Sequence, residues 1–249
     1  ISTAEAQMVE GPKVTWRVSL WGKRRAFTES LEFINKTVKE RTGGKFDFKL
    51  YYGEQLSKSK ENLDSIAVGA VDEELDCQSY HPGKIPAANV LDMPFLPITN
   101  FDVQYEVSKT IFDHPAVKKD FAKWKAIIFA INVLPQYEYM GKGKPPARLA
   151  DFKGMRLRAL GGMGRSAKKI GAVPTTMTAS ETYTALQRGT VDAIGFPYTY
   201  TFSAYKLDEI ADWVTVNMKL GTVNCPIVAN KDSWDRLPKQ YQDLLNSLK

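Results

Sequence analysis

An abrupt change of hydrophobic period within the first fifty residues constrains the fold of this chain more than any other feature. Residues 26–42 are predicted to form a helix, because their apolar side chains recur every three or four residues along one face: Phe27, Leu31, Ile34 and Val38. Gly43 and Gly44 end this helix, since glycine readily adopts the left-handed backbone that closes a helix. Residues 46–50 then alternate strictly between apolar and polar side chains, which is the period of a strand. A helix that leads directly into a strand favours an α/β architecture.

The same alternation extends on both sides of this segment and predicts a parallel sheet. Strands are predicted at 14–20 and 71–78, and a helix over 59–68 ends at Gly69. Strand–helix–strand units of this kind form right-handed crossovers between parallel strands.

A second α/β series is predicted further along the chain, after a strand over 126–134. Strands and helices alternate again, at 155–160, 162–170, 179–188 and 191–194. Thr178 and Glu181 have the spacing of a capping box, in which a hydroxyl and a carboxylate bond backbone amides at the start of a helix.

This alternation divides the chain into two α/β lobes. Two later strands are predicted at 213–218 and 222–229, and they are expected to return to the first lobe. We therefore predict lobe I from residues 1–130 plus about 213–249, and lobe II from residues 131–212.

The composition is that of an ordinary globular protein and excludes several classes. Hydrophobic residues make up 43% of the chain and charged residues 25%, so a packed core is expected. The net charge is +6, but the basic residues are spread along the chain, so no nucleic-acid partner is expected. The longest apolar run, 126–131, is strand-sized, far below the roughly 20 residues of a membrane-spanning helix. No stable membrane insertion is expected.

The cysteines and the N-terminus bear on the compartment. Cys77 and Cys225 are the two cysteines, and such sparse use fits either a reducing compartment or a large exported domain. Two free, buried thiols are favoured, whereas a disulfide would require that both lie on adjacent strands. Ala4-Glu5-Ala6 has the small-x-small form of a signal-peptidase site, which fits either the end of a removed signal peptide or simply a polar terminus.

No catalytic or metal-binding constellation is visible. The two histidines, His81 and His114, each precede a proline and are not spaced as ligands on one element. Gly161-Gly-Met-Gly164 opens a helix, where an anion can bind, but it lacks the third glycine and the acid of a dinucleotide site. We therefore predict no metal and no cofactor. An α/β enzyme acting on a carboxylate substrate is the alternative function, and it would need an acid/base pair in a cleft.

Motifs in both halves of the chain, taken in order, resemble the solute receptors of TRAP (tripartite ATP-independent periplasmic) transporters. The strongest are Leu-Ala-Asp-Phe-Lys-Gly-Met-Arg-Leu-Arg at 149–158, Gly-Ala-Val-Pro at 171–174, and the helix-to-strand stretch at 180–192. Weaker matches in the first half lie at 40–45, 69–72 and 94–97. The resemblance extends over about residues 13–240 and depends on the combination of motifs.

This resemblance implies both a fold and a function. The family fold is a two-lobe periplasmic-binding-protein fold, with mixed sheets flanked by helices and a central ligand cleft. Its members are periplasmic, non-enzymatic receptors that deliver a small organic acid to the TRAP membrane permease subunits. The family also continues with further bracing helices beyond the point at which this sequence ends.

The resemblance also implies which residues bind the ligand. In the family, the last arginine of the Leu-x-Gly-x-(Lys/Arg)-(Ile/Leu)-Arg strand grips the ligand carboxylate, and that position is Arg158 here. A guanidinium presents two parallel donors to a carboxylate. Phe196 and Gly195 replace an asparagine and a glutamate of the family pattern, so Phe196 and Tyr198 are expected to form an aromatic wall, with core packing as the alternative for Phe196. Further contacts, each with ordinary surface or core packing as the alternative, are predicted at Trp21, Arg24, Gln78, Tyr80, Gln136 and Tyr137.

These predicted contacts also bear on the ligand. Gln136 and Tyr137 lie where sialic-acid receptors place a second arginine, which argues against sialic acid. The aromatic side chains favour a partly apolar or aromatic monocarboxylate, or a short branched hydroxy or keto acid. A dicarboxylate remains open if Arg24 or Arg25 faces the ligand.

Overall fold

The computed structural model describes residues 7–94, 96, 98, 100–198 and 200–249. Within these residues the chain forms two compact units. Unit 1 comprises residues 7–76, 121–132 and 226–249. Unit 2 comprises residues 77–120 and 133–225.

These compact units differ from the predicted lobes in three segments, of which the short one, 131–132, groups with unit 1. Residues 77–120 and 213–225 group with unit 2, because 213–214 pair with the second sheet and the side chains of Ser108 and Asn224 are hydrogen-bonded at 2.8 Å. The division into ligand-binding lobes stays a prediction.

Unit 1 is built on a five-stranded mixed sheet. The strand order is β2 (Phe46–Tyr52), β1 (Val14–Leu20), β3 (Glu73–Leu75), β10 (Ile227–Asn230) and β4 (Ala126–Ala130). β1 runs parallel to β2 and β3, whereas β10 runs antiparallel to β3 and β4. The predicted parallel crossovers are therefore confirmed, and the second of the later strands returns to this sheet as β10.

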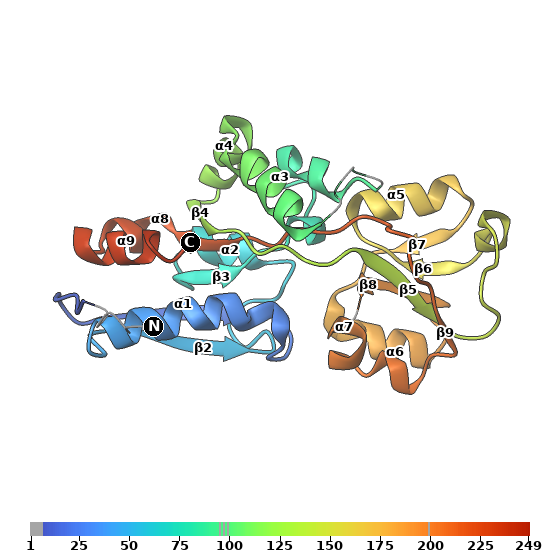
Figure 1. Cartoon of the computed structure of the whole chain (residues 1–249), viewed down its shortest axis with the longest axis horizontal. Helices are drawn as coiled ribbons and strands as arrows, with labels where there is room; N and C mark the ends of the chain where they lie inside the picture. Colours follow the sequence, from blue (N-terminus) through green and yellow to red (C-terminus); the bar gives the residue numbers. More distant parts are fainter. Residues whose placement is uncertain (1–6, 95, 97, 99, 199) are drawn as a thin grey trace. The chain divides into compact units, whose positions relative to one another are not determined.

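Helices cover the sheet of unit 1. They are α1 (Glu29–Arg41), α2 (Asn62–Ala67), α8 (Lys231–Asp235) and α9 (Lys239–Asn246). The predicted apolar stripe is buried, with Leu31 and Val38 at 0% exposure, and α1 lies along β2 (Figure 1). Asn230 begins α8, since its side chain accepts a hydrogen bond from the Ser233 backbone amide at 2.8 Å.

Unit 2 is built on a second five-stranded mixed sheet. The strand order is β7 (Val173–Thr175), β6 (Arg156–Arg158), β8 (Ala193–Pro197), β5 (Tyr137–Gly141) and β9 (Trp213–Val214). β6 runs parallel to β7 and β8, and β5 runs antiparallel to β8 and β9. The strand expected at 213–218 is thus shorter, and it pairs in this second sheet.

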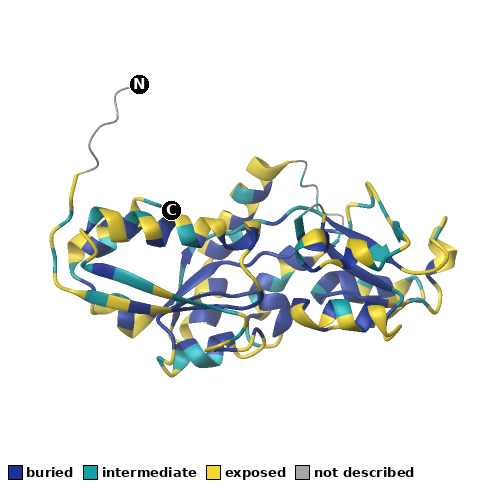
Figure 2. Cartoon of the chain, turned by 90° about the horizontal axis from the view of Figure 1, so that it is seen from below, coloured by how far each residue is buried: buried dark blue, intermediate teal, exposed yellow. Residues whose placement is uncertain are grey.

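The other α-helices and several 3₁₀ turns belong wholly or partly to unit 2. The α-helices are α3 (Phe101–Asp113), α4 (Pro115–Ala122, whose last two residues belong to unit 1), α5 (Gly161–Lys169), α6 (Thr182–Gln187) and α7 (Tyr200–Ala204). The 3₁₀ turns include η2 (Gln78–Tyr80), η3 (Pro86–Asp92) and η5 (Ala179–Glu181). The predicted capping box precedes η5 and α6, with the Thr178 amide donating to Glu181 at 2.7 Å. Every residue of β3, β8 and β10 is buried, and further buried residues lie on the helices and connections of both units (Figure 2). The predicted class, α/β with two mixed sheets flanked by helices, is confirmed.

Cys77 and Cys225 form a disulfide, so the prediction of two free thiols was wrong. Their Cα atoms lie 4.3 Å apart although 148 positions separate them in the sequence. The two segments adjoin because β3 and β10, which flank the cysteines, are antiparallel neighbours in the sheet of unit 1.

Two sequence motifs fall partly or wholly outside the described residues. Ala4-Glu5-Ala6 lies outside them, and so do Phe95 and Pro97 of the motif at 94–97.

Candidate functional site

Strand β6 carries two arginines in opposite environments. Arg156 lies at the surface, and its guanidinium is bound to the Asp192 carboxylate at 2.5 Å. Arg158, two residues later, is 0% exposed. A fully buried arginine is unusual, because removing a guanidinium from water is costly unless a partner compensates its charge.

The guanidinium of Arg158 is held by neutral oxygen atoms. Its Nη1 donates to the backbone carbonyl of Gly195 at 2.7 Å, and its Nε donates to that of Met177 at 3.2 Å. Its Nη2 lies 3.4 Å from the Tyr80 hydroxyl. Across the described part of the chain, no carboxylate forms an ion pair with Arg158. The site therefore contains a buried guanidinium whose orientation is fixed by hydrogen bonds and whose positive charge has no carboxylate partner among the described residues.

Aromatic rings form one wall beside this charge. The Arg158 guanidinium lies 4.4 Å from the centroid of the Phe196 ring, a favourable cation–π geometry. The Phe196 ring stacks on Tyr205 at 5.5 Å and meets Phe202 edge-on at 6.2 Å. Phe196 thus both packs in the core of unit 2 and contacts the predicted ligand-binding group, so the two interpretations of this residue are compatible.

The positive charge of Arg158 affects the pKa values of two buried phenols, those of Tyr137 and Tyr139. Burial raises the pKa of the Tyr137 hydroxyl well above its usual value, and the nearby Arg158 partly opposes this shift. Burial likewise raises the pKa of Tyr139 to about 12, again against the effect of Arg158. Both phenols therefore stay protonated and can serve as neutral hydrogen-bond donors near the cation.

Gly195 packs closely against Arg158 and Tyr139. A Cβ atom at this position would lie 3.1 Å from the Arg158 carbonyl oxygen and 3.1 Å from the Tyr139 ring. A larger side chain here would therefore require these neighbours to shift by a few tenths of an ångström.

The structure brings only some of the predicted contacts together. Arg158 contacts both Tyr80 and Phe196, and Tyr137 is coupled electrostatically to Arg158. Gln136 is committed elsewhere, since its Oε1 accepts from the Gly221 amide at 3.2 Å, and Tyr198 is 39% exposed.

The remaining predicted contacts interact with groups other than Arg158, and two of them belong to the other unit. The Gln78 amide nitrogen lies 3.5 Å from the Asp92 carboxylate. Trp21 and Arg24 belong to unit 1, where Trp21 Nε1 donates to the Leu75 carbonyl at 3.0 Å. For all of these residues, contact with a ligand stays a prediction.

Sequence reasoning missed the backbone acceptors of the site. The carbonyls of Met177 and Gly195 orient Arg158, but a backbone carbonyl leaves no signature in the residue type. The one available signal is the glycine at 195, where the family pattern has a larger side chain.

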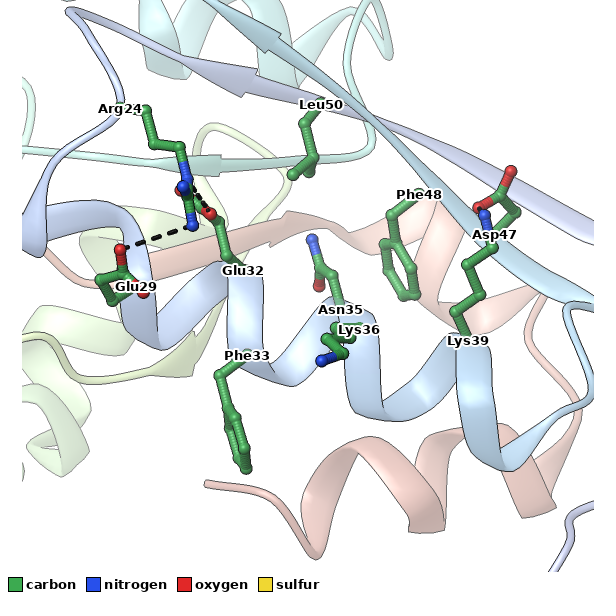
Figure 3. Close-up of a pocket in the computed structure, with 10 residues that line it drawn as sticks. All are labelled: Arg24, Glu29, Glu32, Phe33, Asn35, Lys36, Lys39, Asp47, Phe48 and Leu50. Carbon is green, nitrogen blue, oxygen red and sulfur yellow. Dashed lines mark hydrogen bonds and ion pairs between the residues drawn. The ribbon is translucent and has the colours of Figure 1, made fainter.

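A pocket of about 480 Å³ lies on unit 1 between α1 and β2 (Figure 3). It is lined by Arg24, Glu29, Glu32, Phe33, Asn35, Lys36, Lys39, Asp47, Phe48 and Leu50. Its charges are largely paired internally, because Arg24 binds Glu32 at 2.6 Å and Lys39 binds Asp47 at 2.7 Å. Unlike the cluster at Arg158, this open pocket contains no buried, unbalanced charge that calls for a ligand.

The described residues contain neither a candidate metal site nor a candidate membrane-spanning helix. Among them, no group of three or more His, Cys, Asp or Glu side chains could hold a metal ion. His114 is exposed and accepts from the Ala116 amide at 3.2 Å. None of the helices in this part of the chain is both long and apolar enough to cross a bilayer.

Comparison with known proteins identifies relatives over nearly the whole chain. A solute-binding protein of Verminephrobacter eiseniae is 28% identical over 218 residues, which cover 86% of this chain and 63% of the relative. A monocarboxylate 2-oxoacid-binding periplasmic protein of Nostoc sp. is 26% identical over 244 residues, which cover 95% of this chain and 65% of the relative. This chain thus spans less than two thirds of the length of either curated relative.

A solved structure shares the fold. The TRAP solute-binding protein of Rhodoferax ferrireducens, in complex with copurified benzoate, superposes with a TM-score of 0.86 at 21% identity. The match covers 94% of this chain and 74% of that one. The model of bacterial extracellular solute-binding protein, family 7, matches residues 18–248. The resemblance to TRAP receptors is thereby confirmed, and the chain belongs to bacterial extracellular solute-binding protein family 7.

Proposed function

We propose that this chain is the extracytoplasmic receptor of a TRAP transporter and that it binds a small organic acid through Arg158. The observation that carries the proposal is the buried guanidinium, which is 0% exposed and held by two backbone carbonyls and a phenol. A buried charge without a partner is strongly destabilising. An anionic ligand would supply the missing partner.

The hydrogen-bond count of Arg158 matches a carboxylate. A guanidinium has five N–H groups, and three contacts with described residues use one each at Nε, Nη1 and Nη2. One N–H on each terminal nitrogen is therefore left for a ligand. Two donors on neighbouring nitrogens fit the two oxygens of one carboxylate in the end-on, bidentate arrangement.

The surroundings of Arg158 favour a monocarboxylate with a flat or apolar body. Phe196 offers an aromatic ring, and the phenols of Tyr80 and Tyr137 offer neutral polar groups for a hydroxy or keto substituent. The Rhodoferax protein holds benzoate, and the Nostoc protein is named for 2-oxoacids. Benzoate and 2-oxoacids both belong to the class of acids that this site favours.

The disulfide supports an extracytoplasmic location, because disulfides persist in oxidising compartments such as the periplasm. Family membership supports a receptor that releases its ligand unchanged to membrane permease subunits, and not an enzyme. The acid recovered after binding should therefore be chemically identical to the acid added.

A thermal-shift screen tests this function directly. Benzoate, 3-hydroxybenzoate, pyruvate, 2-oxobutyrate and malate are each added to the protein, and the melting temperature is measured. A ligand that binds only the folded state stabilises it by about 2.7 kcal/mol at a hundredfold excess over Kd. We expect a shift with at least one of the monocarboxylates, and recovery of that acid unaltered by mass spectrometry.

Two arginine variants make the screen specific to the site. Arg158→Ala should remove the shift entirely, since it deletes both carboxylate donors. Arg156→Ala, from the same strand, is the matched control and should keep the shift, because Arg156 is paired with Asp192 at the surface. An equal response of the two variants, or an acid that is converted to another compound, would reject the proposal.

A further inference from the structure

Asp92 is a buried carboxyl group that the ligand-binding proposal does not use. It ends the turn η3 and is 0% exposed. Its Oδ2 accepts a hydrogen bond from the Ser79 hydroxyl at 2.7 Å, and its Oδ1 lies 3.5 Å from the Gln78 amide nitrogen. Both partners belong to η2, so Asp92 ties η3 to η2.

The other side of Asp92 presses against the start of α5. A Cβ atom on Gly161 would lie 2.4 Å from Asp92 Oδ2, and one on Gly162 would lie 2.2 Å from the Asp92 carbonyl oxygen. Real Cβ contacts are not that short, so only glycine permits this approach. Gly161 also has a φ of +45°, which a side chain would disfavour. The start of α5, considered in the sequence as an anion site, thus lies against Asp92, with Gly161 facing its carboxyl group and Gly162 facing its backbone carbonyl.

These two contacts connect the parts of the structure that carry the ligand-binding groups. η2 ends at Tyr80, whose hydroxyl lies 3.4 Å from Arg158 Nη2. α5 begins three residues after Arg158, so its start fixes the end of β6. Asp92 therefore bridges the turn that holds the phenol and the helix that follows the guanidinium.

We propose that Asp92 is a positioning residue of the acid-binding site, which keeps the Tyr80 phenol and the Arg158 guanidinium in register by joining η2 to the start of α5. The inference rests on the proposed role of Arg158 in binding an acid. The physical basis is preorganisation. If the Tyr80 and Arg158 side chains are already oriented before the acid binds, no binding free energy is lost in ordering them.

The cost of burying this group supports a specific role. Burial raises the pKa of Asp92 to about 7, while the Ser79 hydroxyl and the Arg165 guanidinium lower it in part. A neutral apolar residue would avoid this cost. An acid at this position is therefore best explained by the two bridging contacts that it makes.

The test measures hydrogen exchange at the Arg158 side chain and needs no ligand. The protein is labelled with ¹⁵N-arginine, and the Nε–H signal of Arg158 is assigned by its loss in Arg158→Lys. This N–H is bonded to the Met177 carbonyl, so it should exchange slowly with solvent. In Asp92→Ala its exchange should accelerate at least tenfold, whereas Asp92→Asn, which keeps an oxygen for Ser79, should restore most of the protection.

Three controls separate positioning from general loss of stability. The backbone amide of Leu157, fully buried on the same strand, should change less than twofold in Asp92→Ala. Glu73→Gln, at a buried carboxyl of unit 1, should leave the Arg158 signal unchanged. Should Asp92→Ala fail to fold, Ser79→Ala removes one bridging bond and should produce a smaller acceleration of the same kind.

Unchanged exchange at Arg158 in Asp92→Ala, or equal acceleration at Leu157, would overturn the inference. Failure of every acid in the thermal-shift screen would instead reject the proposed function, while these exchange rates would still report whether Asp92 positions Arg158.

Discussion

Unit 1 and unit 2 each tie two parallel strands together with an arginine and an aspartate in the same arrangement. In unit 1, the backbone amide of Arg17 donates to the Asp72 carboxylate at 2.8 Å, and Arg17 Nε does so at 3.2 Å. In unit 2, the corresponding bonds from Arg156 to Asp192 measure 2.7 and 3.2 Å. Each aspartate ends a Gly-x-Val-Asp motif. The two units therefore share one local frame.

The units differ two residues beyond this shared pair. The first strand of unit 1 has Ser19 there, opposite Glu74 on β3. The equivalent position in unit 2 is Arg158, opposite Ile194 on β8. Both frames bury these side chains, but only the second buries a cation. A buried cation can thus occupy one register position of a repeated frame, and the ion pair beside it stabilises the strand ends in both units.

The disulfide offers the largest contrast between the units, because both cysteines belong to unit 2. Closing a loop of this length restricts the unfolded chain, so the Cys77→Ser, Cys225→Ser double variant should be less stable by about 3–5 kcal/mol. Urea unfolding measures this loss. Hydrogen exchange should report greater loss of protection for amides of β8 than for amides of β1. A uniform loss across both sheets would contradict this difference.

Removing the aspartates should produce the next largest effect, and the two should not be equal. Asp72 is the more buried of the pair and also accepts from the Ser233 hydroxyl at 2.6 Å. Hydrogen bonds to a charged group contribute about 1.5–3 kcal/mol. We expect Asp72→Ala to lower the free energy of unfolding by about 3 kcal/mol and Asp192→Ala by about 1.5 kcal/mol, measured by urea denaturation. Equal losses would mean that the extra bond of Asp72 contributes nothing.

Buried carboxyl groups should give the two units different pH dependences. Burial raises the pKa of Glu73 in unit 1 from 4.5 to about 8, with a further rise from Asp72 and a partial reduction by Asn35. The folded state therefore holds this proton more tightly than the unfolded state. Its contribution to stability is complete below pH 4.5 and is lost as the pH rises through 8.

Glu73→Gln should accordingly remove a decline in stability on the order of 3–4 kcal/mol between pH 5 and pH 8. Asp92→Asn of unit 2 should act in a lower window, between its usual 3.8 and its raised pKa of about 7. Urea titrations at five pH values separate the two windows. If both variants keep the decline of the parent protein, the source lies in other groups.

The smallest effect is expected for the surface arginines. The side chains of Arg17 and Arg156 are 45% and 48% exposed, and exposed ion pairs contribute less than about 1 kcal/mol. Arg17→Ala and Arg156→Ala should each lower stability only slightly, and 0.5 M salt should reduce both losses. A clearly larger loss at one of the two positions would mean that the two frames are not equivalent.

Local periodicity was sufficient to predict the elements that carry their own signal. The helix that contains α1 and the strand β2 follow from side-chain spacing, and the position of Arg158 followed from a family motif on β6. The strand β5 lacks a clear alternation and follows a proline, so it was missed although it lies inside the second sheet. The sequence does not show such a strand because its partners, β8 and β9, are distant in the chain.

The disulfide and the acceptors of Arg158 were missed for a related reason. Whether Cys77 meets Cys225 depends on β3 and β10 becoming neighbours, which is a property of the assembled sheet. The carbonyls that hold Arg158 depend on backbone direction at Met177 and Gly195. Contacts made by atoms common to all residues become visible only in three dimensions.

The covalent link between Cys77 and Cys225 also determines how the molecule responds to force and to cutting. Tension applied between the two chain ends passes through the sulfur bridge, so residues 78–224 carry none of it and cannot be pulled out as an extended thread. A single protease nick within that stretch leaves the fragments attached, and they separate only after reduction. Most of unit 2, including β6, thus lies inside a closed ring of chain.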